Sequence, residues 1–220
     1  MKCKNCGTPG EGNYCSNCGQ RTDTGKLSLP VVLQDLSSNI FQVERGFFYT
    51  VKSLFVRPGN MIHEYLEGKR KPYFRPFSYI IFFSTFYFLV TKIVGESTWL
   101  DDFLTGFSHG GSHSERATEI VSMLDWFAKN YAYTTLLLLP VFSVASRISF
   151  LKSGRNYAEH LVLNSYITGQ QAIFYSFFVF LSYLVEFEYM EFFAFGLSMG
   201  YLWVIPYGYF IDFLRKEVAY

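Results

Sequence analysis

Apolar positions follow two patterns along the chain, and the pattern changes within residues 57–76. Between Ser28 and Phe55, apolar residues recur close to the 3.6-residue period of a helix, and polar residues such as Asp35 and Arg45 lie on the opposite face. This pattern predicts an amphipathic helix, either in the headgroup region of a membrane or against a membrane bundle. A helix of a small soluble domain would show the same pattern, but the basic segment that follows favours the membrane surface.

Residues 77–220 contain four apolar runs that approach the length of a membrane-spanning helix. The first carries no charge until Lys92, and the second contains Pro140, which membrane bundles tolerate. The approximate limits of the predicted spans are 77–94, 131–147, 161–185 and 192–211. We therefore expect an all-α membrane protein with four transmembrane helices in this domain.

A basic segment directly precedes the first predicted span. Prolines and glycines within residues 57–76, here named the hinge, limit helix length, so one short helix is expected at 60–67. Each lysine or arginine near an anionic membrane surface adds about 1 kcal/mol of attraction. Residues 28–76 are thus predicted to form the amphipathic helix and a basic juxtamembrane hinge. The candidate lipid-headgroup contacts are Lys69, Arg70, Lys71 and Arg75.

Composition and charge distribution favour the same class of protein. Half of the residues (50%) are hydrophobic and 20% are aromatic, more than one soluble core of this size needs. The net charge of +1 gives no reason to expect nucleic acid as a partner. Residues 1–76 carry 11 of the 19 lysines and arginines, so the positive-inside rule places both termini in the cytoplasm. The polar start predicts no cleavable signal peptide.

All four cysteines lie in the first 18 residues, as two CxxC pairs, each followed by a glycine that permits the turn between two metal ligands. In a reducing compartment this spacing favours a metal site over disulfides. Residues 1–20 are predicted to form a minimal zinc ribbon, and the polar residues 21–27 a linker that gives it freedom. Unligated thiols and an iron–sulfur cluster are the alternatives to structural Zn²⁺. The predicted ligands are Cys3, Cys6, Cys15 and Cys18.

A closed set of four sulfur ligands leaves no position for a substrate water, so catalysis at this ion is not expected. The expected role of the ribbon is to present a small surface to a cytoplasmic protein partner.

The sequence of the hinge also resembles that of a known family segment. Arg57, Pro58 and Gly59 are followed by a second group of matching residues: Glu64, Tyr65, Leu66, Gly68, Lys69, Arg70, Tyr73 and Pro76. Together they resemble the signature segment of a bacterial membrane family that is known only as a domain of unknown function. The resemblance covers the ribbon, the hinge and, more weakly, the segment that begins at Asn156. It implies an N-terminal zinc ribbon followed by several membrane helices, and it implies no activity, substrate or catalytic residue.

Polar residues in and before the third predicted span are the remaining candidates for a site. Glu159 and His160 stand at its cytoplasmic mouth, where ionisable groups are often functional, although an interfacial hydrogen-bonded pair is favoured two to one. Asn164 shares a helix face with His160. Two amides lie deeper and either line a polar path or join helices by hydrogen bonds. These amides belong to Gln170 and Gln171.

Other histidines give weaker signals. His63 and Glu64 begin a pattern like that of a zinc hydrolase, but Glu67 stands where the second histidine would be, so that motif is rejected. His109 and His113 lie in a loop rich in serine and glycine and are expected to be solvated.

The preferred hypothesis is a non-enzymatic, membrane-anchored interaction or regulatory module that uses the ribbon and the basic hinge. The rival class is a small transporter or lipid-handling protein, in which the polar residues of the third span line a path. Tight burial of the glutamines between helices would favour the module. The third hypothesis is an enzyme in which Glu159 and His160 act on a lipid headgroup.

Overall fold

The computed structural model describes residues 1–9, 12–30, 46–98, 101–102, 105–106, 126–127, 129–151, 154–184, 193, 196–197 and 200. Extended pairing within this part is limited to two isolated bridges near the N-terminus, Lys2–Pro9 and Tyr14–Arg21. The longer elements are all helices, so the predicted all-α class is confirmed for the described part. These helices are α2 (Phe47–Val56), α3 (Pro58–Leu66), α4 (Pro76–Val94), α7 (Tyr131–Ser149) and α8 (Tyr157–Leu184).

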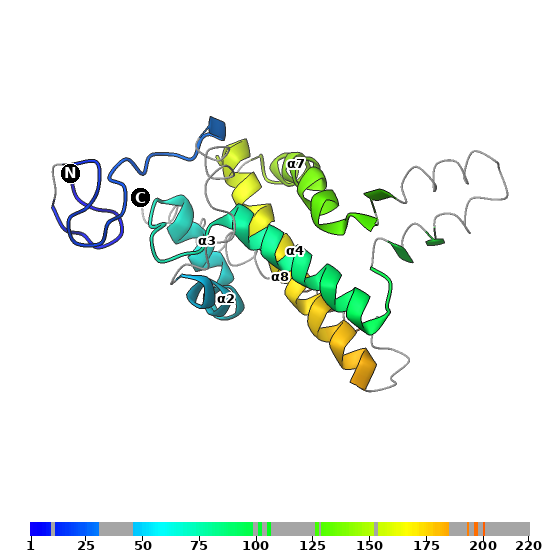
Figure 1. Cartoon of the computed structure of the whole chain (residues 1–220). Helices are drawn as coiled ribbons and strands as arrows, with labels where there is room; N and C mark the ends of the chain where they lie inside the picture. Colours follow the sequence, from blue (N-terminus) through cyan, green and yellow to red (C-terminus); the bar gives the residue numbers. More distant parts are fainter. Residues whose placement is uncertain are drawn as a thin grey trace.

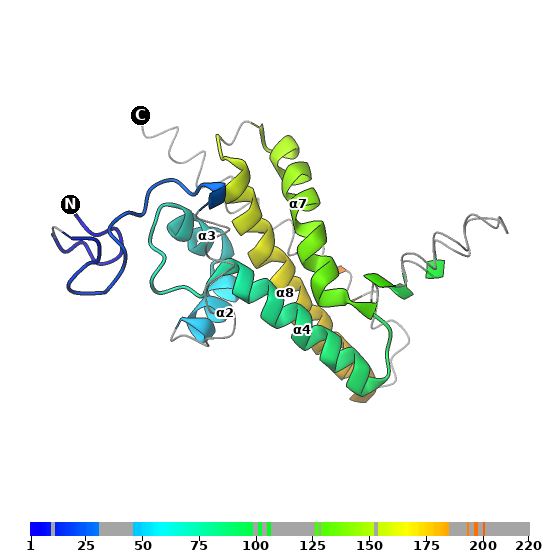
Figure 2. The ribbon, with the colours of Figure 1, turned by 45° about the horizontal axis from the view of Figure 1, so that its top comes forward.

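Helices α4 and α8 run side by side for most of their length, and α7 packs against both (Figures 1 and 2). Gly169 of α8 permits this close approach, because a Cβ atom there would lie 2.4 Å from Cδ1 of Tyr79 on α4. Aromatic side chains fill much of the interface, and the rings of Tyr166 and Tyr79 make an edge-to-face contact. The core of the described part therefore lies between these three helices.

Helices α2 and α3 gather at the N-terminal end of α4 (Figure 1). Pro58 occupies the first turn of α3, where its missing N–H costs no helical hydrogen bond. Gly46 precedes α2, and a Cβ atom there would lie 2.6 Å from the carbonyl oxygen of Pro72, so only glycine fits. Thr50 of α2 accepts a hydrogen bond from the backbone N–H of Phe74 at 2.7 Å. These contacts fix the hinge against α2.

Two helices, α4 and α7, are long and apolar enough to cross a membrane, and they confirm the first two predicted spans as helices. Four spans are not supported by the part of the chain that the structure describes. Helix α8 covers the third prediction up to Leu184, but it is not among the helices that are long and apolar enough to be candidate spans. The fourth prediction, 192–211, lies almost wholly outside the described residues, as does most of the predicted amphipathic helix before Gly46.

The short helix predicted at 60–67 is α3, which begins earlier, at Pro58, because proline is favoured at a helix start. The structure also differs from the expected free linker. Residues 24–27, here named the strap, reach the N-terminal end of α8 (Figure 2), and Leu27 is buried there. The cysteine segment (residues 1–20) is therefore attached to the helices at the end where the hinge lies.

Candidate metal centre and polar interface

The four cysteines converge, and their sulfur atoms all lie within 4.8 Å of one another. The Sγ atoms of Cys3 and Cys18 are 3.6 Å apart, and those of Cys6 and Cys15 are 3.5 Å apart. Each sulfur of one pair thus meets a sulfur of the other pair. This is the arrangement of a site that could hold one metal ion.

The two halves of the centre repeat one backbone turn. Gly7 and Gly19 have φ values of 76° and 69°, and their N–H groups donate to the carbonyl oxygens of Cys3 and Cys15. Few other residues can adopt this left-handed conformation without strain, which confirms the predicted role of the two glycines. Hydrogen bonds between the Cys6 thiol and the side chain and backbone of Thr8 lower the pKa of this thiol to about 6. A thiolate is the form that binds metal.

Gln20 follows the second turn and attaches the cysteine segment to the hinge. Its side chain is only 4% exposed. The Nε2 group donates a hydrogen bond to the carbonyl oxygen of Gly68 at 2.9 Å, and Oε1 accepts bonds from the backbone N–H groups of Arg70 and Lys71, both at 3.0 Å. One side chain therefore satisfies three backbone groups of the loop that follows α3.

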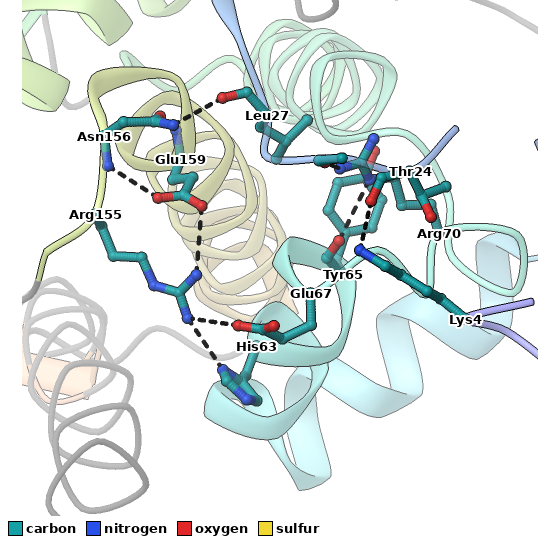
Figure 3. Close-up of polar contacts among 11 residues, drawn as sticks. Lys4, Thr24, Leu27, His63, Tyr65, Glu67, Arg70, Arg155, Asn156 and Glu159 are labelled. Atoms are coloured by element: carbon teal, nitrogen blue, oxygen red, sulfur yellow. Dashed lines mark hydrogen bonds and ion pairs between the residues drawn. The ribbon is translucent and has the colours of Figure 1, made fainter. Parts of the chain in front are cut away.

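Lys4, which lies between the two cysteines of the first pair, makes a second attachment. Its ammonium group donates to the carbonyl oxygen of Thr24 at 2.7 Å (Figure 3). Gly68 has φ +108°, and a Cβ atom there would lie 2.8 Å from Cδ of Lys4 and 3.0 Å from the oxygen of Thr24. The close fit between the cysteine segment, the strap and the hinge thus requires glycine at this position.

The strap continues to α8. Arg70 donates from Nη2 to the carbonyl oxygen of Gly25 at 2.9 Å, and Asn156 donates from Nδ2 to the carbonyl oxygen of Leu27 at 2.8 Å (Figure 3). Because Asn156 directly precedes the first residue of α8, the strap is bonded both to the hinge and to the beginning of this helix.

Glu159 forms a capping box with Asn156. The side chain of each residue accepts a hydrogen bond from the backbone N–H of the other, at 2.9 Å in both directions. Glu159 is 1% exposed, and Arg155 pairs with it at 3.3 Å (Figure 3). The same guanidinium reaches Glu67 of the hinge at 3.1 Å. Glu159 therefore stabilises the start of α8 and its junction with the hinge.

The predicted headgroup cations occupy different environments. Lys69 pairs with Glu64 at 2.7 Å, and Arg70 is bonded to the strap as described. Lys71 is exposed, and Arg75 is half-buried. At least two of the four predicted cations are therefore engaged within the chain.

Glu64 is the centre of a charged cluster within the hinge. Burial raises its pKa, but hydrogen bonds from Lys69, Tyr73 and Arg57 outweigh burial and lower the pKa to about 2. The donor–acceptor distances are 2.7 Å, 2.7 Å and 2.8 Å in that order. Glu64 thus joins α3 to the residues on either side of it.

His160 and Asn164 meet at Ser146 of α7. The Nδ1 atom of His160 lies 3.1 Å from Oγ of Ser146, and Nδ2 of Asn164 donates to the same oxygen at 2.8 Å. Within the described part of the chain, Nε2 of His160 is buried without a hydrogen-bond partner. These residues connect α7 and α8 near the end of the bundle that carries the strap.

Gln170 lies deep between α4 and α8 and is 0% exposed. Its Oε1 accepts a hydrogen bond from the hydroxyl of Tyr79 at 2.6 Å. Gln171 is half-buried on a neighbouring face of α8. Gln170 therefore joins two helices, whereas Gln171 is less buried.

Sequence reasoning missed the residues that attach the cysteine segment, above all Gln20, Lys4 and Asn156. No local pattern marks the first two, because their partners lie elsewhere in the chain. Asn156 and Glu159 do have a signal, since a capping residue followed three positions later by glutamate is typical of a helix start. That spacing would have assigned Glu159 a capping role.

Residues 44–88 match the family described as "Protein of unknown function (DUF3667)". The match covers α2, α3 and most of α4, and it does not extend to the cysteine segment or to α8. No curated protein and no solved structure matches the chain. The match fits an uncharacterised domain and indicates no activity.

Proposed function

We propose that this chain is a membrane-anchored interaction or regulatory module, whose cysteine segment is a cytoplasmic zinc ribbon that binds a protein partner. The observation that carries the proposal is the three-fold hydrogen bonding of Gln20 to the hinge. It holds the ribbon at one end of the helices in a defined position. A partner bound to the ribbon would therefore be held beside the hinge and the start of α8.

We infer that the ion is zinc, for which four cysteine ligands in a tetrahedron are typical of a structural site. Zinc–sulfur bonds of about 2.3 Å in a tetrahedron place the sulfur atoms roughly 3.8 Å apart. The Sγ–Sγ distances of 3.6 Å between Cys3 and Cys18 and 3.5 Å between Cys6 and Cys15 are close to this spacing. Four thiolates close the coordination sphere, which is typical of a structural ion. We infer that zinc replaces the apolar core that a segment this short lacks.

The membrane assignment rests on exposed apolar surface. One face of α7 exposes large apolar side chains, among them Tyr133, Leu137 and Val141, and α4 exposes Leu89 and Ile93. Surfaces of this kind suit lipid. We propose the bacterial inner membrane for this chain, with both termini in the cytoplasm and the exposed Lys71 of the hinge facing anionic headgroups.

The burial of Gln170 favours this module over a transporter. Its hydrogen bond to Tyr79 joins α4 and α8, which is the common role of an amide between membrane helices. The capping role of Glu159 likewise accounts for its burial without catalysis.

The proposal is tested by crosslinking in cells. A photoreactive phenylalanine replaces Tyr14, whose side chain is exposed on the cysteine segment, or replaces Tyr133, which is exposed on α7. We expect one protein crosslinked at position 14, lost in a Cys3→Ser/Cys6→Ser chain and retained in a Ser16→Ala chain. Position 133 should capture lipid. Lipid at both positions, or a protein that the cysteine substitutions leave in place, would overturn the proposal.

A further inference from the structure

The attachments of the cysteine segment come from both halves of the metal centre. Lys4 lies inside the first cysteine pair, and Gln20 follows the second pair after Gly19. Lys4 bonds the strap and Gln20 bonds the hinge, and these two surfaces meet at Gly68. The two side chains can reach their acceptors together only when the halves of the centre are held at a fixed separation.

Within the described part of the cysteine segment, the two halves are joined by the cysteines and by an exposed hydrogen bond from Nδ2 of Asn17 to Oγ1 of Thr8 at 3.2 Å. The buried residues there are Cys3, Cys15 and Gln20, and two isolated bridges supply the regular backbone pairing. The four sulfur atoms lie within 4.8 Å of one another, so an ion bound between them would join the two halves by coordinate bonds that the metal-free cysteines lack. The separation of Lys4 and Gln20 therefore depends on the ion.

The strap transmits this dependence to α8. Its residue Leu27 accepts a hydrogen bond from Asn156, which in turn caps α8 together with Glu159. Arg155, next in the chain, links Glu159 to Glu67 of the hinge. The cysteine segment, the hinge and the start of α8 thus form one hydrogen-bonded unit.

We propose that the metal centre is a latch: with metal bound, Gln20 clamps residues 68–71 of the hinge, and loss of the metal releases them. Release exposes the backbone of Arg70 and Lys71 and removes the bond between Arg70 and the strap. The guanidinium of Arg70, which also contacts the carbonyl oxygen and the ring of Tyr65, is then no longer bonded to the strap and can face an anionic surface. The latch regulates the proposed interaction module, and it rests on the assignment of a metal to the four cysteines.

Hydrogen exchange on the full chain in detergent micelles tests the latch, with Zn²⁺ bound and after removal by a chelator. The amides of Arg70 and Lys71 are bonded to Gln20, whereas the amide of Lys69 is bonded to the carbonyl oxygen of Glu64 and serves as the internal reference. We expect metal removal to speed exchange at Arg70 and Lys71 by at least about tenfold and to leave Lys69 less affected.

A Gln20→Ala chain separates the latch from general unfolding. It should keep its zinc yet show fast exchange at both amides, and metal removal should then add no further change. Ser16→Ala is the matched control, because its side chain is exposed on the same segment, and it should behave as the parent chain. Slow exchange in the metal-free parent, or in the zinc-loaded Gln20→Ala chain, would overturn the latch.

Zinc content, measured on the same samples, separates the two proposals. A chain that binds zinc but keeps its protection after zinc removal refutes the latch alone. A chain that binds no metal refutes the zinc ribbon, and with it the metal dependence of the latch.

Discussion

The attachment of the cysteine segment and the packing of the long helices are built in opposite ways. The attachment uses polar groups from residues far apart in the sequence, and most of them bond backbone atoms, as Gln20 and Asn156 do. The helix packing buries aromatic and aliphatic side chains, with a few polar contacts such as Tyr79 with Gln170. Hydrogen bonds require exact alignment, whereas apolar contact depends on area.

This difference indicates that the two regions tolerate different structural changes. A small displacement breaks the directional bonds of the attachment and leaves the helices packed. The helices in turn withstand small displacements but not the insertion of extra volume at a close contact. Four variants, the first of them a double substitution, test this contrast in order of decreasing expected effect.

Replacing Cys3 and Cys6 by serine should abolish the metal centre. Structural zinc in small domains contributes about 10–16 kcal/mol of apparent binding free energy, and this energy folds the segment. We expect metal analysis to find no bound zinc, while circular dichroism and membrane insertion show the helices intact. Zinc retained by the double variant would refute the assignment of ligands, and loss of the helices would refute the independence of the two regions.

Replacing Gly169 by alanine should destabilise the helix packing and leave the metal centre intact. The new Cβ atom would clash with the ring of Tyr79, which is fully buried, so the ring or the helix must shift. We expect a loss of about 1–3 kcal/mol of stability from this overpacking, measured by denaturation in detergent, with zinc content unchanged. Gly106→Ala is the control, because nothing lies within 4 Å of its added Cβ. Equal stability of the two variants would contradict the close contact.

Replacing Tyr79 by phenylalanine removes a single polar contact from the helix packing. Interhelical hydrogen bonds of this kind contribute about 1 kcal/mol. We expect a loss of that size, and a Tyr79→Phe/Gln170→Leu chain should recover part of it because no buried amide is left unpaired. Tyr133→Phe, at an exposed position of α7, should have no effect. A larger loss in the double variant would show that the hydrogen bond is not the relevant contact.

Replacing Glu64 by glutamine should have the smallest effect, about 0.5–1 kcal/mol at pH 7, because the cluster is partly exposed. The folded pKa of about 2 lies below the ordinary value of 4.5, so ionised Glu64 stabilises the fold above pH 4.5. That contribution is lost as the pH falls towards 2. The difference in denaturation midpoint between parent and variant should therefore shrink from pH 7 to pH 3. A constant difference over this range would contradict the cluster.

The sequence by itself determined the features that depend on neighbouring residues. The CxxC spacing with its following glycines predicted the paired turns, and the apolar run from residue 77 predicted α4 almost to its limits. The spacing of Asn156 and Glu159 also carries the signal of the capping box, although the position of Glu159 before a predicted span equally suggests a functional group. Each of these features depends on contacts within a few residues, so a local pattern is sufficient.

Only the tertiary structure decided how the cysteine segment is attached. Gln20 and Gly68 are 48 residues apart, and Asn156 and Leu27 are 129 apart. No helical or strand period relates such positions, because their contact depends on the path of the whole chain between them. The same holds for Arg70, which looked like a free cation beside a membrane and is bonded to the strap. Charge and spacing predict what a residue can bind, whereas the fold determines which partner lies within reach.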